Sequence, residues 1–168
     1  MSAAPIIVTA LFGPVDQAWF DGLRKKYFPP ERNYLDAHLT MFHHLAPSLE
    51  AELKQRLSAA TRGVKAPVAH AAGLLSLGEG TAYRIESEGL EQIRAELAEA
   101  FAPMLLPQDR AGWRPHVTIQ NKVKPTEAKA LLKRLEGSFQ RKPVAVAGLA
   151  SWYYRGGPWE PLSQHAFG

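Results

Sequence analysis

The sequence predicts an α+β fold composed of two pseudo-symmetric β-α-β-α-β halves. Two observations support this prediction. Strand-like runs rich in β-branched residues alternate with helical patterns along the chain, and two segments of matching pattern begin at His38 and His116. We therefore expect one domain over residues 1–168, with lobe-forming halves of approximately 1–78 and 79–168.

Composition narrows the possible classes of protein. The chain has 168 residues, a net charge of +4 and no cysteine, which excludes disulfides, a thiolate nucleophile and cysteine-based metal sites. Its apolar runs are much shorter than the ~20 residues that a membrane-spanning helix needs, and the N-terminus lacks the basic region of a signal peptide. We expect a cytoplasmic protein that does not associate with membranes.

The first half begins with the run IIVTALF (6–12), which predicts a strand that ends at a Gly-Pro turn. A helix is predicted over about 15–27, before a pair of prolines. The run HLTMFH (38–43) predicts the next strand. A helix with leucines on one face follows Pro47, and a strand near 68–75 completes the half.

The second half repeats this order of elements. The run TAYRIE (81–86) predicts a strand, and a helix is expected over about 88–101. The run HVTIQ (116–120) predicts a strand, which a helix over about 126–139 follows. The apolar run at 144–154 predicts another strand, and the C-terminal GGPWEPLSQHAF predicts a turn and an edge strand.

The two matching segments agree at several positions in the same order. Each has a proline nine residues after its histidine, Pro47 after His38 and Pro125 after His116. Leucines follow at equivalent offsets, and both segments then reach an Ala-Gly-Leu sequence. One such match is expected by chance, but the ordered set indicates a duplicated unit or two pseudo-equivalent halves.

Both segments start with a His-apolar-Thr pattern on a predicted strand. Alternate residues of a strand project from the same face, so His38 and Thr40 point together, as do His116 and Thr118. If the halves pack about a pseudo-two-fold axis, two imidazoles and two hydroxyls face one another across a cleft.

This pair of motifs resembles the 2H phosphoesterases, a family that carries two His-x-Thr motifs and includes 2′-5′ RNA ligases and cyclic nucleotide phosphodiesterases. The matching residues are HLTMF (38–42) and RPHVTI (114–119), and the repeated elements extend the resemblance over almost the whole chain. It implies a bilobal fold whose antiparallel sheets form a central groove that holds the active site. Gln120 and Asn121 depart from the family pattern, in which a small residue and an arginine are frequent.

The residue types suit phosphoester chemistry. Attack on a phosphodiester needs a base that takes a proton and an acid that gives one to the leaving oxygen, and histidine performs either role near neutral pH. We predict His38 and His116 as the catalytic pair and Thr40 and Thr118 as phosphate-binding donors. Which histidine is the acid stays open, because the motifs are nearly symmetric.

No metal or cofactor is expected. The expected partner is a nucleotide or RNA with a cyclic phosphate or a 2′-5′ linkage, and no obligate protein partner is predicted.

The other histidines of the first motif have simpler interpretations. Strand alternation places His44 on the face of His38, at the strand end, and His43 on the opposite face in a structural role. A zinc site formed by His38, His43 and His44 is disfavoured, because side chains that alternate between faces do not converge on one ion.

A second class of function competes with the enzyme. A non-catalytic RNA- or nucleotide-binding module would use the same groove, although binding alone favours arginine or lysine over histidine and threonine. Side chains near the motifs that are candidates for base stacking or phosphate contact are Tyr34, Trp113, Trp152, Tyr154, Arg114 and Arg155.

Overall fold

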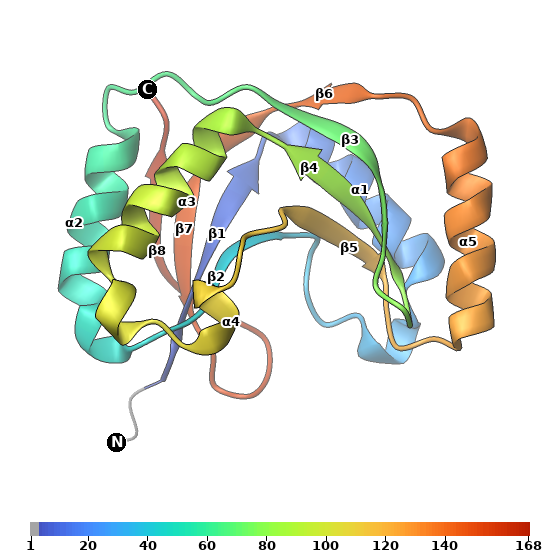
Figure 1. Cartoon of the computed structure of the whole chain (residues 1–168), viewed down its shortest axis with the longest axis horizontal. Coiled ribbons are helices and arrows are strands. Elements are labelled where there is room, and N and C mark those ends of the chain that lie inside the picture. The colour runs from blue at the N-terminus through green and yellow to red at the C-terminus, as the bar shows by residue number, and fades with distance from the viewer. Residues whose placement is uncertain (1–3) are drawn as a thin grey trace.

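The computed structural model describes residues 4–168 and contains strands and helices where the sequence predicts them (Figure 1). The strands are β1 (Ile6–Phe12), β2 (Leu39–Leu45), β3 (Ala69–Ser76), β4 (Thr81–Glu86), β5 (His116–Gln120), β6 (Lys142–Val144), β7 (Val146–Tyr153) and β8 (Glu160–Ala166). The α-helices are α1 (Pro14–Tyr27), α2 (Glu50–Thr61), α3 (Glu88–Ala100), α4 (Pro107–Arg110) and α5 (Pro125–Ser138). Among these elements, the short β6 and α4 have no counterpart in the sequence-based prediction.

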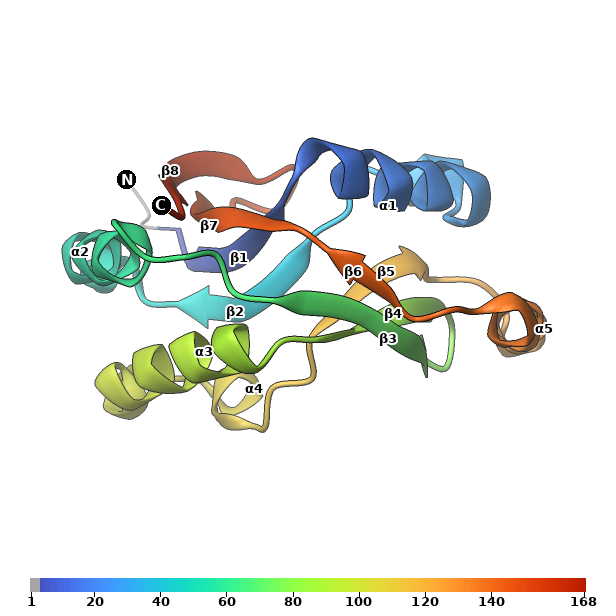
Figure 2. The same ribbon diagram turned by 90° about the horizontal axis from the view of Figure 1, so that it is seen from above.

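The strands form two four-stranded sheets, in which every pair is antiparallel. The first sheet has the order β2-β1-β7-β8 and the second has the order β5-β4-β3-β6. Helix α2 packs beside β7 and β8 of the first sheet, whereas α1 packs on β5 and α5 on β3 and β4 of the second (Figure 2). The predicted α+β class with two antiparallel sheets is confirmed.

The two halves of the sequence, 1–78 and 79–168, do not coincide with the two sheets. The first sheet takes β7 and β8 from the second half, and the second sheet takes β3 from the first half. Helix α1 likewise packs on the second sheet. Each sheet therefore contains strands from both halves of the sequence.

A tight hairpin explains why β3 leaves its own half. Only residues 77–80 connect β3 to β4, and the N–H of Leu77 donates to the carbonyl of Gly80 at 2.9 Å. So short a connection makes β3 and β4 antiparallel neighbours. Gly80 is required at this turn, because a Cβ there would collide with the backbone of Gln120 on β5.

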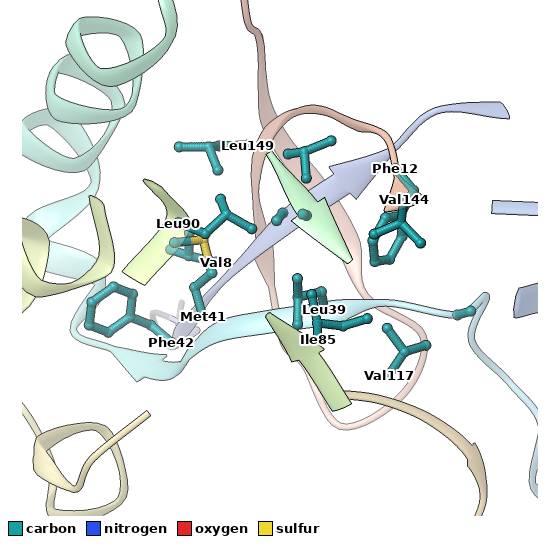
Figure 3. Close-up of a cluster of buried hydrophobic side chains, with 14 of the residues drawn as sticks. Val8, Phe12, Leu39, Met41, Phe42, Ile85, Leu90, Val117, Val144 and Leu149 are labelled. Atoms are coloured by element: carbon teal, nitrogen blue, oxygen red, sulfur yellow. The ribbon is translucent and has the colours of Figure 1, made fainter. Parts of the chain in front are cut away.

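One hydrophobic core joins the two sheets. Val8 and Leu39 of the first sheet lie in the same cluster as Ile85 and Val117 of the second, and Leu90 of α3 joins them (Figure 3). Burial alternates along the start of both motif strands: Leu39, Val117 and their apolar neighbours are buried, whereas the motif threonines are partly exposed. The core thus packs against one face of each motif strand, and the His-x-Thr side chains lie on the other face.

The helix starts match their sequence signals. Pro14 and Pro125 occupy first-turn positions of α1 and α5, where a missing N–H costs no hydrogen bond. Ser87 caps α3 by accepting from the N–H of Leu90 at 3.2 Å. Over residues 4–168, none of the helices combines the length and the apolar character that crossing a membrane would require.

Candidate active site

The two motif strands are edge strands that lie side by side. β2 ends the first sheet and β5 ends the second, and the two strands are in contact. The indole N–H of Trp113, just before β5, donates to the carbonyl oxygen of Thr40 on β2 at 2.9 Å. The structure therefore brings together two motifs that are 78 positions apart in the sequence.

Each of the two motif histidines makes an equivalent hydrogen bond to the backbone. Nδ1 of His38 lies 2.8 Å from the carbonyl oxygen of Asp36, and Nδ1 of His116 lies 2.7 Å from that of Arg114. A carbonyl oxygen only accepts, so each Nδ1 carries the proton. Each Nε2 is then the atom left for proton transfer, and its orientation is fixed by a partner two residues earlier in the chain.

His38 is covered by an aromatic side chain that its motif does not contain. Its ring lies against Trp159 with centroids 4.6 Å apart and planes at 58°. Burial lowers the pKa of His38 from 6.5 to about 4, and charges on Arg24 and His116 lower it too, against the opposing effect of the hydrogen bond to Asp36. His38 is therefore neutral at pH 7, and His116 is close enough to influence it.

The motif threonines lie on the same faces as their histidines. Thr40 is partly exposed, faces Thr9 across the β1–β2 pair and lines a small cavity together with His116. Thr118 alternates with the buried Val117, and its carbonyl oxygen accepts from Nη1 of the buried Arg24 at 3.0 Å. This bond ties α1 of the first half to the strand of the second motif.

Two side chains of α1 hold the backbone before His38. The carboxylate of Asp21 accepts from the N–H of Ala37 at 2.7 Å, and the amide of Gln17 donates to the carbonyl oxygen of Ala37 at 2.8 Å. Gln17 also donates to Asp21 at 3.0 Å, which fixes both side chains. Sequence reasoning missed these residues; their spacing of four on one helix is compatible with an ordinary surface pair.

A cavity of about 350 Å³ opens beside His38. Its wall includes Tyr34, Trp152 and Trp159, together with Thr9, whose hydroxyl accepts from the indole N–H of Trp152 at 2.9 Å. Tyr34 and Trp152 are among the candidates from the sequence. Trp159 was missed because it lies in the loop before β8, where no local pattern points to a site.

A second cavity of about 150 Å³ adjoins His116, and His43 lines it with Thr40, Gln108 and Arg114. The position of His43 contradicts the prediction from strand alternation, which placed it on the face opposite His38. Two register shifts against β1 interrupt β2. As a result, Met41 and Phe42 are both buried, and His43 and His44 are both exposed. Such bulges reverse the alternation of side chains, and His43, rather than His44, lines this cavity.

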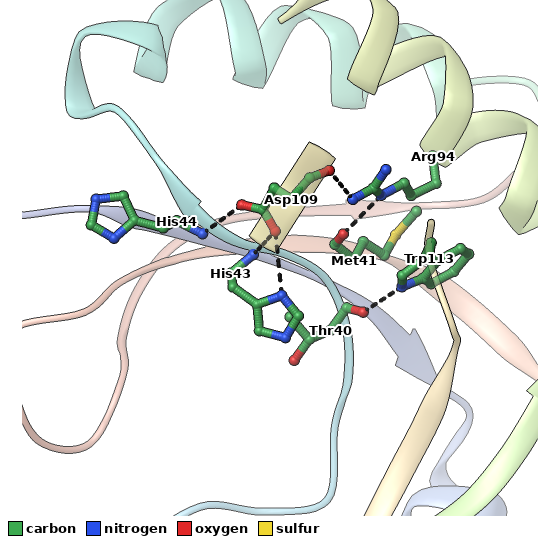
Figure 4. A network of polar contacts seen from close by, with 7 residues as sticks. All are labelled: Thr40, Met41, His43, His44, Arg94, Asp109 and Trp113. Atoms are coloured by element: carbon green, nitrogen blue, oxygen red, sulfur yellow. Dashed lines mark hydrogen bonds and ion pairs between the residues drawn. The ribbon is translucent and has the colours of Figure 1, made fainter. Parts of the chain in front are cut away.

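Asp109 holds the bulged segment of β2 (Figure 4). One carboxylate oxygen accepts from the N–H of His43 at 2.8 Å and contacts its Nδ1 at 3.3 Å, and the other accepts from the N–H of His44 at 2.9 Å. Arg94 donates to the carbonyl oxygens of Met41 and Asp109 at 3.1 and 2.6 Å. Asp109 and Arg94 are both buried, so α3 and α4 fix the free edge of β2.

The remaining candidates for base stacking or phosphate contact lie in several parts of the structure. Trp113 serves the contact between β2 and β5, Arg114 lines the second cavity, and Tyr154 lines neither cavity. Arg155 pairs with Glu160 at 2.7 Å on the surface. Among the described residues, His, Asp and Glu side chains nowhere gather in a group of three that could hold a metal ion.

Comparisons with known proteins agree with the fold. The family model described as the 2′-5′ RNA ligase superfamily matches residues 12–158. Solved structures with a similar fold include E. coli LigT complexed with 3′-AMP (TM-score 0.62, 16% identity, 99% of both chains) and with NADP+ (0.61, 17%, 99% of both). The protein TT0787 of Thermus thermophilus is comparable (0.61, 15%, 97% of both). No curated protein sequence matches the chain.

Proposed function

Because the chain belongs to the 2′-5′ RNA ligase superfamily, we propose that it is a phosphoesterase that acts on a 2′,3′-cyclic phosphate, 2′-5′-linked RNA or a related cyclic nucleotide. The observation that carries this proposal is the matched pair His38 and His116. Each imidazole donates through Nδ1 to a backbone carbonyl two residues earlier, on neighbouring strands. General acid–base catalysis of phosphoester cleavage uses one such group as the base and another as the acid.

In hydrolysis of a 2′,3′-cyclic phosphate, one Nε2 takes a proton from water while the water oxygen bonds to phosphorus. The bond from phosphorus to one ribose oxygen breaks, and the other Nε2–H gives its proton to that oxygen. The product is a phosphomonoester with a free neighbouring hydroxyl. Each proton transfer contributes typically ~10²–10⁴-fold to the rate.

The environment of His38 supports the role of the base. A base must be neutral when substrate binds, and the lowered pKa of about 4 keeps His38 neutral at pH 7. We assign His38 as the base. His116 is then the acid, since the two roles need opposite protonation states. Thr40 and Thr118 share the faces of the histidines, and their hydroxyls donate to the non-bridging phosphate oxygens.

The wall of the larger cavity supports a nucleotide substrate. Trp152 and Trp159 line this cavity, and Trp159 packs against His38. Aromatic rings stack on nucleobases with ~1–3 kcal/mol per base. Solved proteins of similar fold include E. coli LigT complexed with 3′-AMP and with NADP+, both of which are nucleotides. We therefore assign the nucleobase of the substrate to this cavity.

Turnover of defined substrates tests the proposal. The purified protein is incubated with 2′,3′-cyclic AMP and with a 2′-5′-linked diadenylate, and products are separated by chromatography. Release of a phosphomonoester by the wild type, and its loss in His38→Ala and His116→Ala, is expected. Binding of these nucleotides without turnover would favour the non-catalytic binding module instead.

A further inference from the structure

His43 is the third histidine at the site and has no part in the mechanism above. It projects from the bulged strand β2 and lines the 150 Å³ cavity with Thr40, Arg114 and His116. Figure 4 shows its ring beside Thr40 and turned toward Asp109 through Nδ1. Within residues 4–168, Nε2 of His43 makes no hydrogen bond.

The chemistry of this cavity suits an anion. Its wall contains the donor side chains of His43, Gln108, Arg114 and His116 and the hydroxyl of Thr40. Among the residues that the structure describes, no Asp or Glu lines it. The carboxylate of Asp109 is shielded, being 1% exposed and occupied by its contacts with β2. An anionic oxygen in the cavity meets donors without repulsion.

Building on the proposed function, we propose that Nε2 of His43 donates a hydrogen bond to a non-bridging oxygen of the substrate phosphate that Thr40 contacts, and that Asp109 is the residue that positions His43. A histidine that donates through Nδ1 to a carboxylate and through Nε2 to a phosphate carries both ring protons. In the complex, the ring of His43 therefore donates one hydrogen bond to the buried carboxylate of Asp109 and one to the substrate phosphate. Asp109 also accepts a hydrogen bond from the backbone N–H of His43, which fixes the backbone from which the side chain projects.

His44 provides a matched control. It is the neighbouring residue with the same side chain, its N–H is held by the same carboxylate, and it is absent from the cavity wall. Replacement of either imidazole leaves both backbone N–H bonds to Asp109 in place. A difference between His43→Leu and His44→Leu therefore reports on the contacts of the His43 imidazole, which are the cavity and Asp109.

Binding of inorganic phosphate, measured by calorimetry at pH 7, tests the inference without turnover. His43→Leu should weaken the phosphate Kd about tenfold or more, as expected when a charge-assisted hydrogen bond is lost, whereas His44→Leu should stay within about twofold. His43→Gln, which keeps an uncharged donor, should be intermediate. If His43→Leu does not fold, as judged by circular dichroism, the comparison of His43→Gln with His44→Gln decides.

Kinetics with 2′,3′-cyclic AMP add a second readout. His43→Leu should lower kcat/KM about tenfold or more relative to His44→Leu. The inference is overturned if the His43 and His44 variants match in phosphate binding, or if the wild type binds no phosphate at millimolar concentration. Phosphate binding that depends on His43 in a protein that turns over none of the substrates would overturn the proposed function and leave the phosphate contact standing.

Discussion

The ring of Trp159 lies over that of His38, with centroids 4.6 Å apart. The indole comes from the loop before β8, far in sequence from the motif that it covers. Its contact contributes to the burial that lowers the pKa of His38 to about 4. A side chain outside both motifs thus contributes to the environment that lowers the pKa of a motif histidine.

Turnover should depend on pH through His38. The acid limb of kcat/KM, which reports loss of the neutral base in the free enzyme, should lie near pH 4. Trp159→Ala admits water to the imidazole and should move this limb upward, toward the ordinary histidine value of about 6.5. Trp152→Ala changes the same cavity without uncovering His38 and should leave the limb in place. Equal shifts in the two variants would contradict this account.

The same lowered pKa should make the stability of the protein depend on pH. The folded-state pKa of His38 lies below the unfolded value of about 6.5, so the unfolded chain takes up the proton first on acidification. The contribution of His38 to the free energy of unfolding should therefore fall as the pH drops from about 6.5 to about 4. Urea titrations of the wild type and His38→Gln across this range should show a smaller loss in the variant.

Replacement of the two motif histidines should be strongly non-additive. His38→Ala and His116→Ala should each lower kcat by roughly 10²–10⁴. The double variant should lose far less than the product of these factors, because residues that act as a unit fail together. Single-turnover rates of the three variants provide the comparison. Near-normal rates in both single variants would remove the pair from the catalytic machinery.

Asp109→Ala should be among the most destabilising single substitutions. The change leaves the N–H groups of His43 and His44 without the acceptor that they have in the wild type, at about 1–3 kcal/mol each. Glu52→Ala, which removes an exposed carboxylate paired with Arg56 on α2, should cost less than about 1 kcal/mol. Urea unfolding at pH 7 measures both, and similar losses in the two variants would show that Asp109 does not hold β2.

Activity should survive removal of divalent metal ions, since the proposed mechanism transfers protons between histidines, water and substrate only. Turnover of 2′,3′-cyclic AMP in excess EDTA should equal that of the untreated protein. Loss of activity that zinc or manganese restores would show that the two-histidine mechanism is incomplete.

Much of the local structure was determined by the sequence itself. β1, α1, β5 and α5 lie where residue patterns place them, because the alternation of a strand and the 3.6-residue repeat of a helix are local properties. The His-x-Thr pairs project together for the same reason. The repeat also indicated two equivalent motifs, and their strands are indeed the neighbouring edges β2 and β5.

Tertiary structure decided which segments meet. The placement of β7 and β8 in the first sheet depends on which strand edges pair, and local periodicity carries no information about that choice. The bulges that turn His43 into the cavity arise from the register of β2 against β1 and from the hydrogen bonds to Asp109. Trp159 reaches His38 from a loop, and a local pattern cannot predict which distant side chain will exclude water from a motif histidine. Contacts between residues far apart in sequence, rather than the motif alone, therefore determine the surroundings of the motif strands and lower the pKa of His38.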